Sequence, residues 1–144
     1  MAYKKIKPPF DEAQLREIWR TEYCEQIIKT FDDIVVQFYE SMFNHCFYES
    51  ANRFTKDKSI LSYNRLEKIY WIKEALQDPD AILKVGWDAK NKTYDGSRRI
   101  TVVKDNYIVV IIIFSPTKAR FVTAYEVDAE ENLEKIMNSP DYKA

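Results

Sequence analysis

The stretch RRITVVKDNYIVVIIIFSPTKARFVTAYEV, residues 98–127, decides the fold of this chain. It contains three runs rich in β-branched and aromatic residues, separated by Asp105-Asn106 and by Ser115-Pro116-Thr117. Asp and Asn tolerate the positive φ values of a two-residue hairpin turn, and proline has no N–H to donate to a ladder. The strands that this pattern predicts cover residues 98–104, 107–114 and 118–127, as a three-stranded antiparallel meander.

The middle run of the meander has no polar residue between Tyr107 and Phe114. A strand that is apolar on both sides is covered on both faces or lies centrally in its sheet. The outer runs carry cations, a threonine and a tyrosine among their apolar residues. Any chemistry is therefore expected on the outer strands.

Before and after the meander, apolar residues recur at the spacing of amphipathic helices. Asp11 is placed to cap the first helix and Asp128 the last. The β-branched run Ile34-Val35-Val36 fits a short strand as well as a helix. The predicted helices cover residues 12–29, 39–52, 64–76 and 129–137, with a helical turn at 81–83 after Asp78-Pro79. The other predicted segments are an extended arm over 1–10, a polar loop over 53–64 and a short strand over 85–88.

The chain has 144 residues, of which 46% are hydrophobic and 31% are charged. This length and composition predict that residues 1–144 form one domain with its own core. Because no apolar run reaches 18 residues and no signal segment opens the chain, we expect a cytoplasmic protein with no membrane partner. Helices come first, then strands, then a short helix, which is the order of an α+β fold.

Scarce residue types exclude several kinds of site. Cys24 and Cys46 form no metal-binding pattern and His45 is the single histidine, so no metal site is expected. Gly86 and Gly96 are too few to form a loop that cradles phosphates. We therefore expect no cofactor.

Charge is segregated along the chain, although the formal net charge is −1. Residues 11–49 contain three cations and nine acids, whereas residues 84–125 contain eight cations and three acids. A basic sheet on an otherwise acidic protein suits a polyanionic ligand at one face. Ordinary solvating charge on strands and helices accounts for the same segregation equally well.

His45 is the side chain best suited to act as an acid or a base near neutral pH. It lies among Phe43, Phe47 and Tyr48, so a partly buried histidine with a satisfied hydrogen bond is the competing interpretation. No serine or cysteine of the chain sits in a nucleophile motif.

Cations of the first outer strand are further candidates. Side chains alternate along a strand, so Arg98 and Lys104 are expected on one face and Arg99 on the other. At most one of the two arginines can therefore serve a site on a given face. Charged residues at an exposed strand end give the same pattern without any function.

Hydroxyl groups of the last outer strand complete the set. Thr123 and Tyr125 are expected to share a face with Phe121, and Arg120 is expected on the opposite face. Tyr94, near the turn before the strands, is of the same kind. These hydroxyls fit either the edge of a core or a pocket that contacts a phosphate.

A histidine, cations and hydroxyls near one sheet suit the cleavage of RNA without a metal. A base removes the 2′-OH proton, cations stabilise the charge that develops on the phosphoryl oxygens, and an acid protonates the leaving 5′-oxygen. The RNA supplies its own nucleophile, so no reactive protein nucleophile is required.

Several segments together resemble the phage-type members of the barnase–EndoU–colicin E5/D–RelE nuclease superfamily. These segments are His45 onward through YNRLEKIYWIKEALQDPDAI, the Tyr94–Arg99 turn and strand, YIVVIIIF and ARFVTAYEV, within residues 38–127. The resemblance implies N-terminal helices packed on a curved antiparallel sheet of about four strands, with ribonuclease activity. It matches His45 to a helical histidine, Arg98 or Arg99 and Lys104 to a strand cation, and Thr123 and Tyr125 to late-strand hydroxyls.

The expected function is therefore that of a toxin-like, metal-independent endoribonuclease, with tRNA as a candidate target and an inhibitor protein as a candidate partner. His45 would act as base or acid, and Tyr94 and Arg120 would contact the substrate. Two other functions fit the sequence. One is a nuclease-derived module that binds RNA or a protein without turnover. The other is a phage or mobile-element structural protein that self-assembles through aromatic residues such as Phe47, Tyr48 and Trp87.

Overall fold

The computed structural model describes most of the chain. The described residues are 5–6, 11–49, 60–61, 63–88, 93–127 and 129–141, and the side chains of 45, 48–49, 60–61, 63–64, 87–88 and 93–99 are not described. Most of the predicted arm and of the predicted polar loop, and the predicted cap Asp128, therefore lie outside the described residues.

The predicted meander is confirmed. Its strands are β6 (Thr93–Lys104), β7 (Tyr107–Ser115) and β8 (Lys118–Glu126), each antiparallel to the next. Asp105 has a φ of 53°, the positive value that a tight hairpin turn requires. The apolar strand β7 lies between β6 and β8, as expected for a strand that is covered on both faces.

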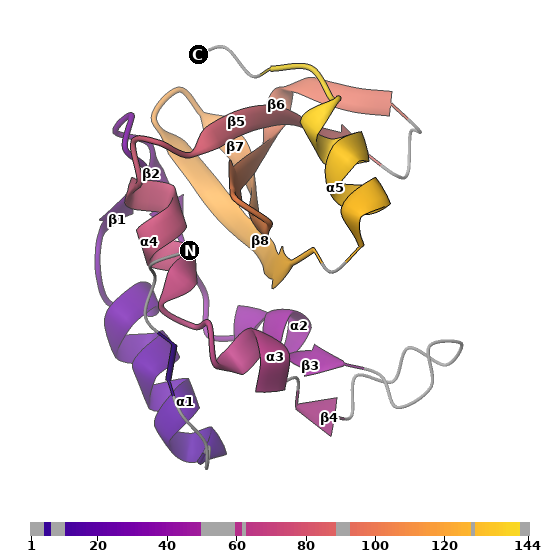
Figure 1. The fold of residues 1–144 in the computed structure, drawn as a ribbon. Coiled ribbons are helices and arrows are strands. Elements are labelled where there is room, and N and C mark those ends of the chain that lie inside the picture. Colours follow the sequence, from indigo (N-terminus) through magenta and orange to yellow (C-terminus); the bar gives the residue numbers. More distant parts are fainter. Residues whose placement is uncertain are drawn as a thin grey trace.

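The sheet is larger than predicted, with six strands in the order β1-β2-β8-β7-β6-β5 (Figure 1). The prediction of about four antiparallel strands is wrong in number and in direction, because β2 (Val35–Gln37) pairs parallel to β8. The β-branched run that fitted either a strand or a helix thus contributes a strand. The remaining strands are β1 (Ile28–Lys29) and β5 (Ile82–Asp88) in this sheet, and β3 (Tyr48–Glu49) with β4 (Ile60–Leu61) in a separate pair.

Helices form in the predicted regions, but the helix predicted over 64–76 is interrupted after Leu66 and the one predicted over 39–52 is shorter at both ends. Asp11 caps α1 (Glu12–Trp19) by accepting hydrogen bonds from the Ala13 and Gln14 amides, as expected. The predicted helix over 12–29 is too long, because a π-helical turn (Arg20–Cys24) follows α1 and the chain then enters β1. The helical turn predicted at 81–83 is also wrong, since β5 begins at Ile82. The other helices are α2 (Met42–Phe47), α3 (Tyr63–Leu66), α4 (Trp71–Gln77) and α5 (Glu130–Met137).

The two faces of the sheet are covered by different helices (Figure 1). One face, here called the main-core face, carries Ile100, Val109 and Phe121, which are buried together with residues of α1, α2 and α4. The other face, here called the α5 face, carries Val103 and Ile108 in a smaller cluster with α5. The alternation predicted for β6 is confirmed here, since Ile100 and Val102 face the main core and Val103 faces α5.

Aromatic rings make up much of the main core. Trp19 is 1% exposed, and its indole N–H donates to the Tyr39 carbonyl at 3.0 Å. Phe47 is also 1% exposed and packs edge-on against Trp19. The prediction that Phe47 belongs to an exposed self-assembly surface is therefore wrong, because the helical spacing of α2 turns this ring inward. The side chains of Tyr48 and Trp87 lie outside the described residues.

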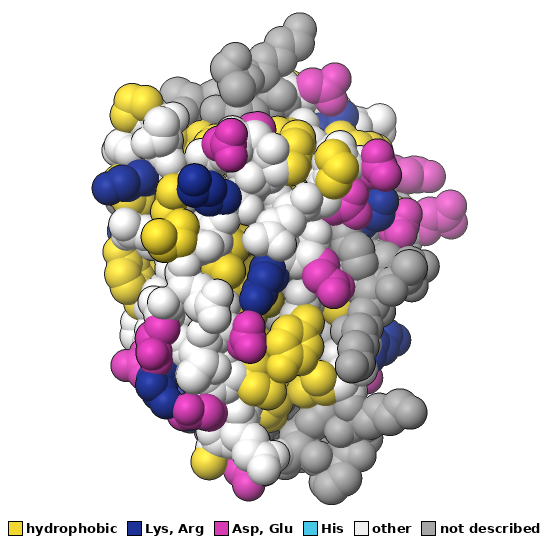
Figure 2. All heavy atoms as spheres, turned by 90° about the vertical axis from the view of Figure 1, so that its left-hand side faces the viewer, with side chains coloured by type: hydrophobic (Ala, Val, Ile, Leu, Met, Phe, Trp, Pro, Cys, Tyr) yellow, Lys and Arg dark blue, Asp and Glu magenta, His cyan; other side chains and the backbone are white. Residues whose placement is uncertain are grey.

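The face that bears β1, α1 and α4 shows no large zone of one charge. Figure 2 shows basic and acidic side chains interspersed on it, with hydrophobic side chains between them. Such a surface matches ordinary solvating charge. In the part of the chain that the structure describes, no helix is both long enough and apolar enough to span a bilayer.

The Cys24 thiol is expected to react slowly with alkylating reagents. Burial, and then the nearby carboxylates of Glu40 and Glu25, raises the pKa of Cys24 to about 11 from an ordinary 9.0. Because the thiolate is the nucleophile, alkylation at pH 7.5 is expected to be roughly 100-fold slower than for a free cysteine derivative and to accelerate as pH rises. Peptide-resolved mass spectrometry after iodoacetamide pulses measures this rate. Labelling at the rate of an ordinary thiol would contradict the burial described.

Candidate functional site

A β-bulge in β8 determines which side chains face the candidate site. Val110 pairs with Thr123 while Ile111 pairs with Phe121, so Val122 is an extra residue in β8. An extra residue reverses the side-chain alternation beyond it. The prediction that Thr123 and Tyr125 share a face with Phe121 is therefore wrong.

The hydroxyl residues of β8 lie on the α5 face. Phe121 is buried in the main core, whereas Thr123 and Tyr125 line a pocket under α5. The bulge also reverses the prediction for Arg120. This exposed residue pairs with Ile112, two positions along β7 from Val110, and so falls on the same face as Thr123 and Tyr125.

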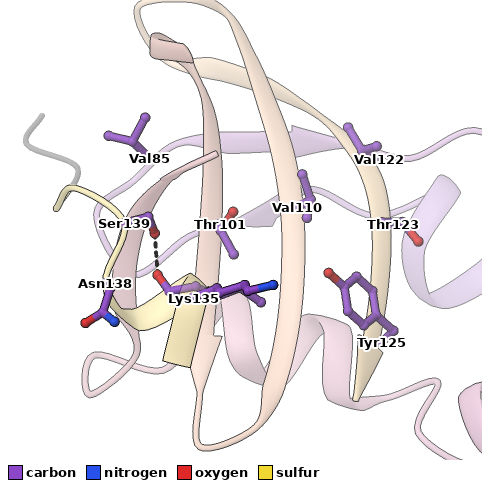
Figure 3. Close-up of a pocket in the computed structure, with 10 residues that line it drawn as sticks. Val85, Thr101, Val110, Val122, Thr123, Tyr125, Lys135, Asn138 and Ser139 are labelled. Atoms are coloured by element: carbon purple, nitrogen blue, oxygen red, sulfur yellow. Dashed lines mark hydrogen bonds between the residues drawn. The ribbon is translucent and has the colours of Figure 1, made fainter. Parts of the chain in front are cut away.

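The pocket lies between the α5 face of the sheet and the segment formed by α5 and the turn after it (Figure 3). Its volume is about 710 Å³. Thr101, Val110 and Thr123 form one row across β6, β7 and β8, because Val110 pairs with both threonines. The lining residues are Val85, Thr101, Val110, Val122, Thr123, Tyr125, Lys135, Ile136, Asn138 and Ser139.

Tyr125 connects this pocket to a second group of residues, around α2 and α3. The Arg65 guanidinium lies over the Tyr125 ring, 5.6 Å from its centroid. Arg65 Nη1 also donates a hydrogen bond of 2.9 Å to the Cys46 carbonyl of α2. Burial raises the pKa of Tyr125, and Arg65 opposes this shift only in part, so the phenol stays protonated at neutral pH.

The helix that carries His45 packs against β8 between Thr123 and Tyr125. Cys46 Sγ lies 3.8 Å from the Ala124 carbonyl oxygen, and both residues are buried. The backbone of His45 is therefore one residue from a direct contact with the strand of the predicted hydroxyls. The His45 side chain lies outside the described residues.

The predicted cations of β6 do not all lie near the hydroxyl residues of β8. Lys104 is not brought together with Thr123 and Tyr125, because it forms an ion pair of 3.3 Å with Asp78 at the end of α4. The backbone of Arg99 pairs with Ile112, which in turn pairs with Arg120 of β8. Arg98 and Tyr94 also lie in β6, and the side chains of these two residues and of Arg99 lie outside the described residues.

Sequence reasoning missed three residues that the structure places beside Thr123 or Tyr125. Arg65 belongs to a segment that the sequence predicts as a helix, 60 positions before Tyr125. No local spacing therefore relates the two residues. Lys135 and Ser139 reach the pocket from the C-terminal segment. The usable signal was Lys135, a basic residue on a predicted helix whose neighbours Glu130, Glu131 and Glu134 are acidic.

Among the described residues, no group of three or more His, Cys, Asp or Glu residues is arranged to hold a metal ion. Comparisons of the chain with protein-family models, with curated protein sequences and with solved structures find no match.

Proposed function

We propose that this protein is a metal-independent endoribonuclease that acts where α2 and Arg65 meet the end of β8. The observation that supports this proposal most directly is the contact between Cys46 and Ala124 at 3.8 Å. It brings the backbone of the single histidine next to the strand segment that carries Thr123 and Tyr125. Arg65 supplies a cation at the same place, through its contacts with the Cys46 carbonyl and the Tyr125 ring.

The proposed roles follow from the chemistry of each group. His45 acts as the base that removes the 2′-OH proton or as the acid that protonates the 5′-oxygen. Arg65 stabilises the negative charge that develops on the phosphoryl oxygens, together with an arginine of β6. Tyr125, which contacts Arg65, donates a hydrogen bond to the phosphate because its phenol remains protonated, and Thr123 supplies a hydroxyl to the RNA on the α5 face.

The Arg120 side chain is proposed to bind the RNA backbone on the α5 face. It is exposed and shares that face with Thr123 and Tyr125. A guanidinium pairs readily with a phosphate and does not read the base sequence. Tyr94 and Lys104 both lie in β6. In this proposal they contact the RNA where it extends along that strand.

The proposal is tested by incubating the purified protein with tRNA in the presence of EDTA. Cleavage products ending in a 2′,3′-cyclic phosphate are expected, because the 2′-OH is the nucleophile. His45→Ala is expected to lower the cleavage rate by about 10²-fold or more, the usual contribution of a positioned acid or base. Arg65→Gln is expected to lower it as well, through loss of transition-state stabilisation.

Matched controls separate loss of chemistry from loss of charge or fold. Lys29 is exposed on β1, away from β8's hydroxyl residues, so Lys29→Gln removes one cation and is expected to cleave at the wild-type rate. Each variant is checked by circular dichroism before assay. A folded wild-type protein that binds tRNA without cleaving it would refute the enzyme and favour the binding module instead.

A further inference from the structure

The pocket under α5 has a roof that is tied down at both ends. At one end the Val127 amide donates to the Asn106 carbonyl at 2.8 Å. At the other, the Val85 amide donates to the Pro140 carbonyl at 2.8 Å, and Lys84 Nζ lies 2.6 Å from Asp141 Oδ1. The helix between these ties has no fully buried residue. Leu133, Ile136 and Met137 pack on the smaller cluster, and the rest of the roof is held over the sheet with a pocket beneath it.

The lining of this pocket combines apolar walls with a few donors. Val85, Val110, Val122 and Ile136 supply the walls. Thr101, Thr123 and Tyr125 supply three hydroxyls, and no described residue forms a hydrogen bond with any of them. Thr101 is buried and the other two are half-buried, and polar groups of this kind without a protein partner are available to a ligand.

Lys135 gives the pocket its charge. Figure 3 shows its side chain extending from α5 over the sheet toward Val110, on the side where Thr123 and Tyr125 lie. Lys135 is the only charged residue among those lining the pocket in the described part of the chain. A site with one cation, several hydroxyl donors and apolar walls favours a ligand with a single negative charge.

We propose that this pocket binds a small organic monoanion, a carboxylate with a short apolar body. The carboxylate accepts hydrogen bonds from Lys135, Thr123 and Tyr125, and the apolar body lies against the valines and Ile136. The volume of about 710 Å³ is within the usual range for sites that take small molecules. This inference shares Thr123 and Tyr125 with the proposed RNA site but needs neither His45 nor Arg65, so it stands or falls without RNA cleavage.

The test is a titration of the full-length protein with sodium octanoate, followed by amide NMR shifts. Saturable shifts are expected at residues of β8, β7 and α5 that line the pocket. Octan-1-ol, which has the same chain without the charge, is expected to bind about tenfold more weakly, because it loses a charge-assisted hydrogen bond. Octyl phosphate, a dianion near pH 8, is expected to bind no more tightly than octanoate.

Two variants and one control make the outcome decisive. Lys135→Gln is expected to reduce octanoate affinity to that of octanol, while Lys29→Gln leaves it unchanged. Ile136→Trp, on the partly exposed roof, is expected to fill the pocket and abolish binding of both probes while the protein stays folded. Octanoate shifts that fail to saturate, that survive Ile136→Trp, or that ignore Lys135→Gln would overturn the proposal. Tighter binding of octyl phosphate than of octanoate would overturn the choice of a carboxylate.

Discussion

Replacing Trp19 with alanine is expected to lower the free energy of unfolding by about 3–5 kcal/mol, the usual cost of removing a buried large aromatic side chain. This residue is 1% exposed and lies where α1, α2, β8 and the segment after β2 meet. Its ring contacts, with centroid distances, are Tyr23 at 4.9 Å, Phe38 at 5.5 Å, Phe47 at 5.5 Å and Phe121 at 5.6 Å. Without the indole, a cavity remains between the four surrounding rings, which cannot move far enough to fill it. The Tyr39 carbonyl also loses its hydrogen-bond donor.

Urea unfolding followed by circular dichroism measures the Trp19 effect. Trp19→Phe keeps an aromatic ring and loses the indole N–H, so it is expected to fall between the wild type and Trp19→Ala. Ile27 is 78% exposed, and Ile27→Ala is expected to change the free energy of unfolding by less than about 0.5 kcal/mol. If Trp19→Ala unfolded within about 1 kcal/mol of the wild type, these aromatic contacts would not be the centre of the core.

Replacing Lys68 with alanine is expected to destabilise the protein by about 3–5 kcal/mol, as when one partner of a buried ion pair is removed. Lys68 is 1% exposed, and its ammonium lies 3.1 Å from Glu67 Oε1 and 3.5 Å from Glu126 Oε1. It also lies 5.5 Å from the centroid of the Trp71 ring. Alanine leaves a cavity and two neighbouring carboxylates without the cation between them.

The pH dependence separates the charge of Lys68 from its volume. Burial alone would raise the pKa of Glu67. The nearby ammonium groups of Lys68 and Lys5 lower this pKa by more than burial raises it, so the pKa lies below its ordinary value. A carboxyl with a lowered folded-state pKa stabilises the protein above its unfolded pKa, near 4.5, and this contribution is lost as pH falls through the folded value. Lys68→Met keeps most of the side-chain volume and removes the charge. It is therefore expected to lose less stability than Lys68→Ala, and its stability is expected to decline less below pH 4.5 than that of the wild type.

A surface ion pair provides the contrast for Lys68. Lys73 and Glu22 lie 3.0 Å apart with 23% and 38% of their side chains exposed, so Lys73→Ala is expected to cost less than about 1 kcal/mol. Thermal melts of the wild type and the three variants between about pH 2 and pH 8 give the stability loss of each variant and its dependence on pH. Equal losses for Lys68→Ala and Lys73→Ala would show that burial of Lys68 adds nothing to its ion pairs.

The parts of the fold that sequence reasoning predicts are those with strong local patterns. The turn at Asp105 and the apolar strand β7 each depend on residues that are neighbours in the sequence, so the meander could be predicted from them. The helix predicted over 12–29 fails because Tyr23 and Ile27 continue the helical spacing past the point where the chain turns. Ile27 is 78% exposed while Ile28 is buried in β1, so pairing with β2 overrides the helical pattern.

The candidate site was less predictable because it depends on a bulge and on contacts between distant segments. Phe121, Val122 and Thr123 are all suited to a strand, and nothing in their types indicates which one is extra. The bulge changes which face Thr123 and Arg120 share. Arg65 reaches Tyr125 only after α3 packs near β8, so its position is a property of the tertiary fold.

The parallel pairing of β2 with β8 has a consequence for how the chain reaches its native state. The partners Val36 and Ala119 are 83 positions apart, and the first two strands of the meander, β6 and β7, are made between them. During synthesis, β2 and the β1 strand beside it have no partner sheet until β8 has emerged from the ribosome. Such distant pairings slow folding, because a long loop closes before any contact rewards it. Residues 28–37 therefore cannot take their place in the sheet until residues 118–126 have been made.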